Sequence, residues 1–164
     1  MKTLGVTAAL AVSLPISPLS AAELPATIDV PNVAVVATYH AEGVQLYECS
    51  SDANRKLWRF REPIAVLISD GTTVGRHHAG PTWEHSDGSM VRAKPVGSAP
   101  GATLDDIPWL RLDVVSQLGN GALYGVTSVQ RINTRGGVAA GSCDQVGAFR
   151  SIPYAADYIF LRKD

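Results

Sequence analysis

Apolar and polar side chains alternate with a period of two along much of this 164-residue chain, and this pattern limits the fold more than any other feature. It is clearest over residues 109–115, where Leu110, Leu112 and Val114 share one side. Alternate residues of a strand face opposite sides of a sheet, so the pattern predicts half-buried strands. No window of eleven or more residues shows helical periodicity with capping residues. The chain is therefore expected to be all-β.

Turn-forming dipeptides separate the expected strands at short intervals. Asp70-Gly71 and Asp87-Gly88 are typical of hairpin turns, and Gly119-Asn120-Gly121 supplies a third turn. Many short strands between such turns predict an antiparallel β-sandwich or β-barrel in a single domain. The sequence leaves the choice between these two architectures open.

Three segments carry more particular expectations. Glu42-Gly43 is expected to turn the chain between two short strands. Residues 63–68 are continuously apolar, which predicts a strand that is buried on both faces. Residues 94–106 are rich in Pro, Gly, Ser and Ala, which predicts a surface loop or flap.

The amino-terminal segment resembles a secretory signal peptide over residues 1–22. Lys2 precedes an apolar stretch, and Ser20-Ala21-Ala22 places small residues at a cleavage site. The stretch is too short and too interrupted by proline for a membrane span. Residues 23–164 are therefore predicted to form one secreted or periplasmic β-domain. The full 164-residue chain is 46% apolar and 18% charged, which excludes a disordered chain.

Two cysteines, Cys49 and Cys143, follow the predicted signal peptide. An even number of cysteines in an oxidising compartment predicts one disulfide. The alternative is a pair of separate buried thiols. A catalytic cysteine is disfavoured because no Cys-His motif is present and Cys143 lies in a loop-like sequence.

The densest group of chemically active side chains lies in residues 76–89. Here His77 could act as a general base that is oriented by Glu84 or Asp87. The alternative is structural: Asp87 holds a turn and Trp83 lies in the core. Adjacent strand residues face opposite sides, so His77 and His78 would not share one ion, and no metal site is predicted.

Arg131 is the second candidate, at the end of an expected strand. Its guanidinium could bind an anionic group of a ligand, with Trp83 as a further wall of the pocket. It could instead hold the loop that follows it or pair with Asp87. No dinucleotide, phosphate-loop or calcium-loop motif is present, so no cofactor is expected. A net charge of −1 without a basic run argues against a nucleic-acid partner.

Several short motifs, in order, resemble the family known as domain of unknown function 3455, which comprises exported bacterial and fungal proteins. The resemblance implies a secreted, mostly β domain and implies no activity. The matching residues are Tyr47-Glu48-Cys49, Trp58-Arg59-Phe60, His77, residues 80–84 and 87–89, Ile107-Pro108-Trp109-Leu110, residues 130–137, Cys143-Asp144, Pro153-Tyr154 and Asp157-Tyr158.

These observations favour an exported β-domain that binds a small molecule or an envelope surface, or that serves as a structural module. The alternative is a small extracytoplasmic hydrolase or isomerase that uses His77 with Glu84 or Asp87.

Overall fold

The computed structural model describes residues 24–53 and 55–164, and within them it contains strands and no helix. The predicted signal peptide lies outside the described residues. No helix in the described part of the chain has the length and apolar character that crossing a membrane requires. The strands are β1 (Val33–Asp52), β2 (Arg55–Ser69), β3 (Thr72–His78), β4 (Thr82–His85), β5 (Met90–Ala99), β6 (Trp109–Leu118), β7 (Ser128–Gly136) and β8 (Phe149–Lys163).

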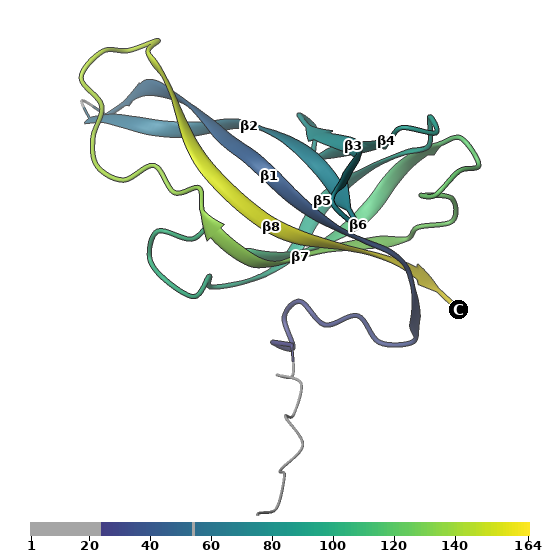
Figure 1. Ribbon diagram of the computed structural model, residues 1–164. Coiled ribbons are helices and arrows are strands. Elements are labelled where there is room, and N and C mark those ends of the chain that lie inside the picture. Colours follow the sequence, from purple (N-terminus) through teal and green to yellow (C-terminus); the bar gives the residue numbers. More distant parts are fainter. Residues whose placement is uncertain (1–23, 54) are drawn as a thin grey trace, which may run out of the picture.

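The eight strands form one closed antiparallel barrel in sequence order (Figure 1). Each strand pairs with the next, and β1 also pairs with β8, from Val33 opposite Lys163 to Glu48 opposite Phe149. The all-β prediction is confirmed, and the architecture is the barrel rather than the sandwich. Closure leaves no sheet edge unpaired along the body of the barrel.

Local turn chemistry explains one expected hairpin and corrects another. Asp70 and Gly71 have φ angles of 48° and 74°, as the two-residue turn between β2 and β3 requires. At Gly43 the expected turn is absent, because β1 runs through it as one strand. A Cβ atom there would collide with the Ile64 carbonyl and with Ala65. This glycine allows two strands to approach closely instead of turning the chain.

The structure also corrects the other two local expectations. Residues 63–68 are not buried on both faces, since Ile64 is 51% exposed and Val66 is 41% exposed while Leu67 is buried. Residues 94–99 are not a flap, because they belong to β5 and pair with β6. The connecting loop is confined to residues 100–108.

Large side chains fill the middle of the barrel. Trp83, Tyr158, Phe160, Leu112 and Val91 are all at most 2% exposed and belong to one apolar cluster. Successive residues of each strand face alternately into and out of the barrel, so the inward residues of all strands add to this single cluster. Burial of these side chains is the main source of stability for the barrel.

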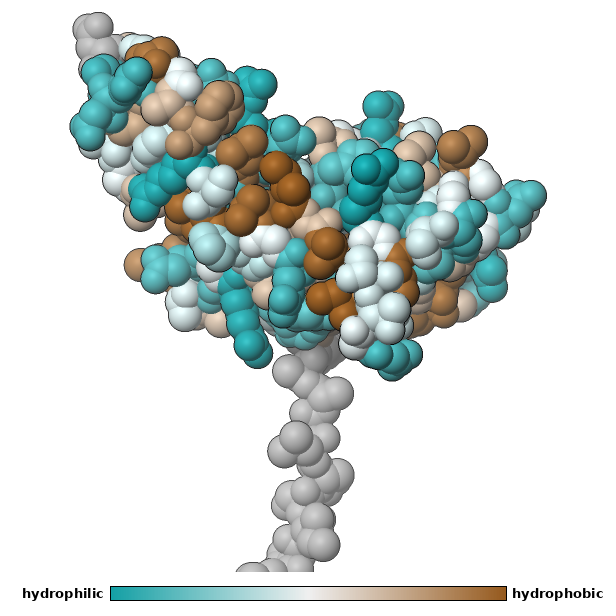
Figure 2. All heavy atoms as spheres, turned by 45° about the horizontal axis from the view of Figure 1, so that its top comes forward, coloured by the Kyte–Doolittle hydropathy of each residue, from teal (hydrophilic) through white to brown (hydrophobic). Residues whose placement is uncertain are grey.

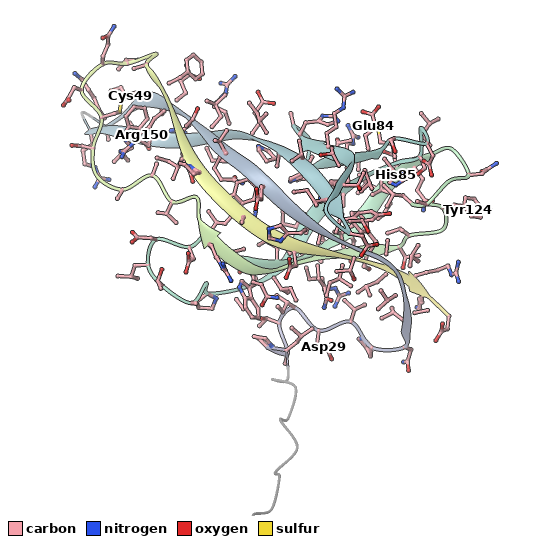
Figure 3. All side chains as sticks on the ribbon, viewed as in Figure 1. Asp29, Cys49, Glu84, His85, Tyr124 and Arg150 are labelled. Atoms are coloured by element: carbon pink, nitrogen blue, oxygen red, sulfur yellow. A yellow bond between two sulfur atoms is a disulfide. The ribbon has the colours of Figure 1, made fainter. Side chains whose placement is uncertain are left out.

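One end of β1 and β2 extends beyond the barrel together with the start of β8. These strands lie side by side at the upper left of Figure 1. The predicted disulfide is present near this tip, where Cys49 of β1 joins Cys143 of the loop before β8 (Figure 3). Their Cα atoms are 5.7 Å apart, and both cysteines are buried. The bridge closes a loop across a separation of 94 residues.

Candidate functional site

A cavity of about 330 Å³ lies inside the barrel on the side of the projecting strands. Barrels of eight strands are just wide enough to be filled by side chains or to hold one small ligand. Apart from a few polar groups, its walls are apolar and aromatic. The lining residues are Gln45, Tyr47, Phe60, Pro63, His77, Pro81, Trp83, Pro95, Ile107, Pro108, Leu110, Leu112, Arg131 and Tyr158.

Contacts from three sides fix the His77 ring in the cavity wall. Its Nδ1 lies 2.9 Å from the Thr82 carbonyl oxygen and donates to it. The ring stacks on Trp83 with centroids 4.4 Å apart and an interplanar angle of 7°. The Tyr158 ring packs on it at an interplanar angle of 61°, with centroids 4.9 Å apart. His77 is 3% exposed, so it belongs to a packed aromatic group.

Burial determines the charge of this histidine. Loss of water around the imidazolium lowers the pKa of His77 to about 3. The hydrogen bond to the Thr82 carbonyl raises this pKa and offsets only part of the effect of burial. The ring is therefore neutral near neutral pH. With Nδ1 as donor, Nε2 carries the free lone pair, and it forms no hydrogen bond within the described residues.

Arg131 enters the cavity wall from β7. It lies opposite Leu110 on β6 and opposite Tyr158 on β8, and all three residues line the cavity. Its Nε and Nη2 atoms donate to the Pro108 carbonyl at 3.1 and 2.8 Å. Arg131 thus holds the loop that precedes β6 through a backbone carbonyl, whereas the structural interpretation placed its contacts with the loop that follows it or with Asp87.

Two buried nitrogen atoms of cavity-lining residues have no hydrogen-bond partner among the described residues. They are Nε2 of Gln45 and Nε1 of Trp83, in side chains that are 2% and 1% exposed. Buried polar atoms are nearly always paired in folded proteins, because an unpaired one loses its bond to water without replacement. Both atoms are inaccessible to solvent, so they lie behind the cavity surface and do not face its interior.

Glu84 does not lie beside His77. Across β3 and β4, His77 is opposite Trp83, while Arg76 is opposite Glu84. The first pair faces the interior, so the second pair faces outward, because neighbouring strand residues alternate. Glu84 accepts two hydrogen bonds from Arg76, at 2.9 and 2.7 Å, on the outer surface (Figure 3).

Asp87 lies at the opposite end of the barrel, in the turn between β4 and β5. Its carboxylate accepts from the backbone N–H and hydroxyl of Ser89, at 2.8 and 2.6 Å, and from the N–H of Ala122 at 2.7 Å. His85 lies 3.0 Å from it. These hydrogen bonds, led by that of the Ser89 hydroxyl, hold the pKa of Asp87 well below its usual range. The arrangement ties two turns together.

A family model described as a protein of unknown function (DUF3455) matches residues 30–74 and 69–162. The chain belongs to the DUF3455 family. Searches of the curated proteins and of the solved structures found no match. The matched segments include every site residue considered above.

A second polar group of this DUF3455 chain was missed by the sequence reasoning. On the outer face of the barrel, Asp157 lies 2.8 Å from Nδ1 of His40 and accepts from Asn133 at 2.8 Å. A shallow depression of about 450 Å³ includes these residues. The register of β1, β7 and β8 assembles the group, and no local motif marks it.

Gln45 was also missed, because it lies in the middle of a long strand without a recognisable motif. The described residues contain no group of three or more His, Cys, Asp or Glu side chains placed to hold a metal ion. Among the residues that this DUF3455 barrel brings together at the cavity are His77, Trp83, Arg131, Gln45 and Tyr158.

Proposed function

We propose that the barrel binds a small, mainly apolar molecule in its internal cavity. The cavity itself carries this proposal: an apolar and aromatic pocket of about 330 Å³ with a few polar groups in its wall. Ligand sites in proteins commonly have this composition and begin at about 300 Å³. The guanidinium of Arg131 and the imidazole of His77 give the wall polar groups that a ligand could contact.

The binding would take place outside the cytoplasm. The disulfide between Cys49 and Cys143 fits an oxidising compartment, and a leader over residues 1–22 would direct the chain there. We therefore propose a secreted or periplasmic domain whose partner is a small molecule. Attachment to an envelope surface is the other partner to be tested.

The contacts of His77 favour binding over acid/base catalysis. A histidine whose pKa is about 3 is a weak base near neutral pH. Its Nδ1 is engaged by a backbone carbonyl, and the two carboxylates considered as its orienting groups have partners elsewhere. A hydrolase or isomerase using His77 with Glu84 or Asp87 would need both side chains to move.

A neutral fluorophore tests the proposal directly. N-phenyl-1-naphthylamine, added to the folded protein, should show saturable fluorescence enhancement with one site per chain. Leu110→Trp should abolish this signal, because Leu110 lines the cavity and the larger ring would occupy it. Leu118→Trp is the matched control, on the same strand but 62% exposed. Equal binding by both variants, or no saturable binding by the unaltered protein, would refute the proposal.

A further inference from the structure

We propose that the ligand of this cavity is a small amphipathic anion, with an apolar body and a carboxylate that Arg131 binds. This inference rests on the proposed function and adds the chemical class of the ligand. Three observations carry it: the charge balance of the cavity wall, the N–H donors of Arg131 and the effect of its charge on the tyrosine hydroxyls around it.

The charge balance comes first. Arg131 carries the one formal charge of the cavity wall, since no Asp or Glu is among the lining residues and His77 is neutral. Over residues 24–53 and 55–164, no carboxylate forms an ion pair with Arg131. A cation in an apolar surrounding is poorly solvated, so it favours an anionic partner.

Other arginines of the barrel show the contrast. Those on the outer surface either meet a carboxylate or stand in water, where a charge needs no protein partner. The ion-paired examples are Arg59 with Asp52, Arg61 with Glu48, Arg76 with Glu84 and Arg111 with Asp113. Arg131, by contrast, is half-buried and meets a backbone carbonyl and the Tyr158 hydroxyl instead of a carboxylate.

Arg131 also has donors to spare. A guanidinium carries five N–H groups in one plane, and the Pro108 carbonyl engages Nε and Nη2. The Tyr158 hydroxyl is a further hydrogen-bond partner of the guanidinium, and the five N–H groups exceed these contacts. Planar carboxylates match the guanidinium fork and form its strongest hydrogen bonds.

The charge of Arg131 reaches other polar groups of the cavity. Burial raises the pKa of the Tyr47 and Tyr158 hydroxyls, and the positive charge of Arg131 opposes this rise at both. A wall whose one charged group is a hydrogen-bond donor fits a ligand with acceptor oxygens.

The apolar part of the ligand is limited by the remaining walls. Phe60, Leu110 and Leu112 line the cavity together with four proline residues, Pro63, Pro81, Pro95 and Pro108. The volume of about 330 Å³ lies at the small end of the range for ligand sites. A one- or two-ring aromatic acid or a medium-chain aliphatic acid fits these conditions.

Matched ligand pairs test the proposal on the unaltered, disulfide-bonded protein. We would measure the displacement of N-phenyl-1-naphthylamine by 2-naphthoate against 2-naphthamide, and by octanoate against octanamide. Each pair has the same shape and differs in charge. At least one acid should bind about tenfold or more tightly than its amide, because hydrogen bonds to a charged group are the stronger ones.

Two variants locate this preference. Arg131→Gln should reduce the affinity for the acid about tenfold and leave that for the amide within about twofold. Arg131→Lys, which keeps the charge, should retain a preference for the acid. Circular dichroism melting checks that each variant is folded. If Arg131→Gln does not fold, the matched pairs and the weakening of acid binding by added salt decide the question.

Each remaining outcome overturns a defined statement. Equal binding of acid and amide, or an acid preference that survives in Arg131→Gln, overturns the anion proposal and leaves a neutral ligand in the cavity. Fluorophore binding without displacement by either pair also overturns it. Absence of saturable fluorophore binding by the unaltered protein overturns the proposed function itself.

Discussion

The two ends of the barrel are built in opposite ways from the same stretch of chain. At the end that holds Asp87, its carboxylate accepts a hydrogen bond from the Ser89 hydroxyl, and both groups accept hydrogen bonds from backbone N–H groups of the loop before β7. Leu123 and Val126 of that loop are fully buried. At the other end, His77 and Arg131 line a cavity, and nearby N–H groups remain unpaired.

This difference between the two ends indicates that one end contributes mainly to stability and the other to binding. Residues 76–89 contribute to both ends, and a short strand, β4, divides them. A satisfied hydrogen-bond network makes a rigid closure, whereas unpaired buried donors lower stability unless something fills the space. Changes at the closed end should therefore reduce stability alone, and changes at the cavity end should alter binding or the response to pH. The four predictions below test this division, beginning with the largest effect.

Removing the disulfide should have the largest effect. Cys49→Ala combined with Cys143→Ala removes a cross-link between residues 94 positions apart in the sequence. The chain-entropy model assigns about 4–5 kcal/mol of unfolding free energy to such a bridge. Urea unfolding of both proteins measures the loss. Because the bridge ties the projecting strands, hydrogen exchange should accelerate more in β1 beyond Gln45 than at Ser89. Equal acceleration at both ends would break the comparison.

Acid should weaken the protein through His77. The unfolded imidazole gains a proton near pH 6.5, whereas the folded one resists protonation down to about pH 3. The unfolded state therefore binds more protons in this window, and stability falls with falling pH. The unfolding free energy should drop by about 2 kcal/mol from pH 7.5 to 5.

Variants of two neighbouring histidines check this assignment. His77→Phe keeps a ring against Trp83 and should abolish most of the pH dependence in that range. His78→Gln, at a neighbouring position that is more exposed, should retain it. Asp87 acts in a different window: its lowered pKa makes it lose its contribution as the pH falls below its unfolded value of 3.8. If the effects of His77 and Asp87 on stability fell in the same pH range, the contrast between the two ends of the barrel would be contradicted.

Ser89→Ala should reduce stability at the closed end without affecting ligand binding. The Ser89 hydroxyl donates to Asp87 and accepts from the Leu123 N–H at 3.1 Å, in a side chain that is 1% exposed. Its loss leaves a buried donor unpaired, which should lower the unfolding free energy by about 1–2 kcal/mol. Ser116→Ala, at an exposed position, is the control. A change in fluorophore affinity would show that the two ends are coupled.

Phe60→Ala should have the smallest effect on stability and a visible effect on binding. Phe60 lines the cavity and is 52% exposed, so its truncation should change the unfolding free energy by less than about 0.5 kcal/mol. Apolar side chains gather where the projection joins the barrel (Figure 2). The affinity for N-phenyl-1-naphthylamine should fall several-fold. Phe149→Ala, at 62% exposure, should leave the affinity unchanged.

The strands and several turns could be predicted because their signals are local. Alternation of polarity located β6, and Asp70-Gly71 has the conformational freedom that its turn requires. Gly43 misled for a physical reason: glycine serves turns and close strand contacts equally well. The choice of a barrel depends on the pairing of β1 with β8, which no local pattern encodes.

The candidate site could be predicted in part. His77, Trp83 and Arg131 were identified as residues of interest, but their grouping depends on strand register. Register places Trp83 opposite His77 and turns Glu84 outward, so closeness in the sequence gave the wrong neighbour for the imidazole. Gln45 carries no motif and becomes notable only when its burial is known.

The pairing of the first strand with the last has a consequence for how the molecule forms. β1 meets β8 along most of its length, so the barrel stays open until residues 149–163 have left the ribosome or the translocation channel. Contacts between such distant parts of a chain make folding slow. Until then the interior faces of seven strands would remain exposed, and a chaperone that shields them would be needed most in this interval.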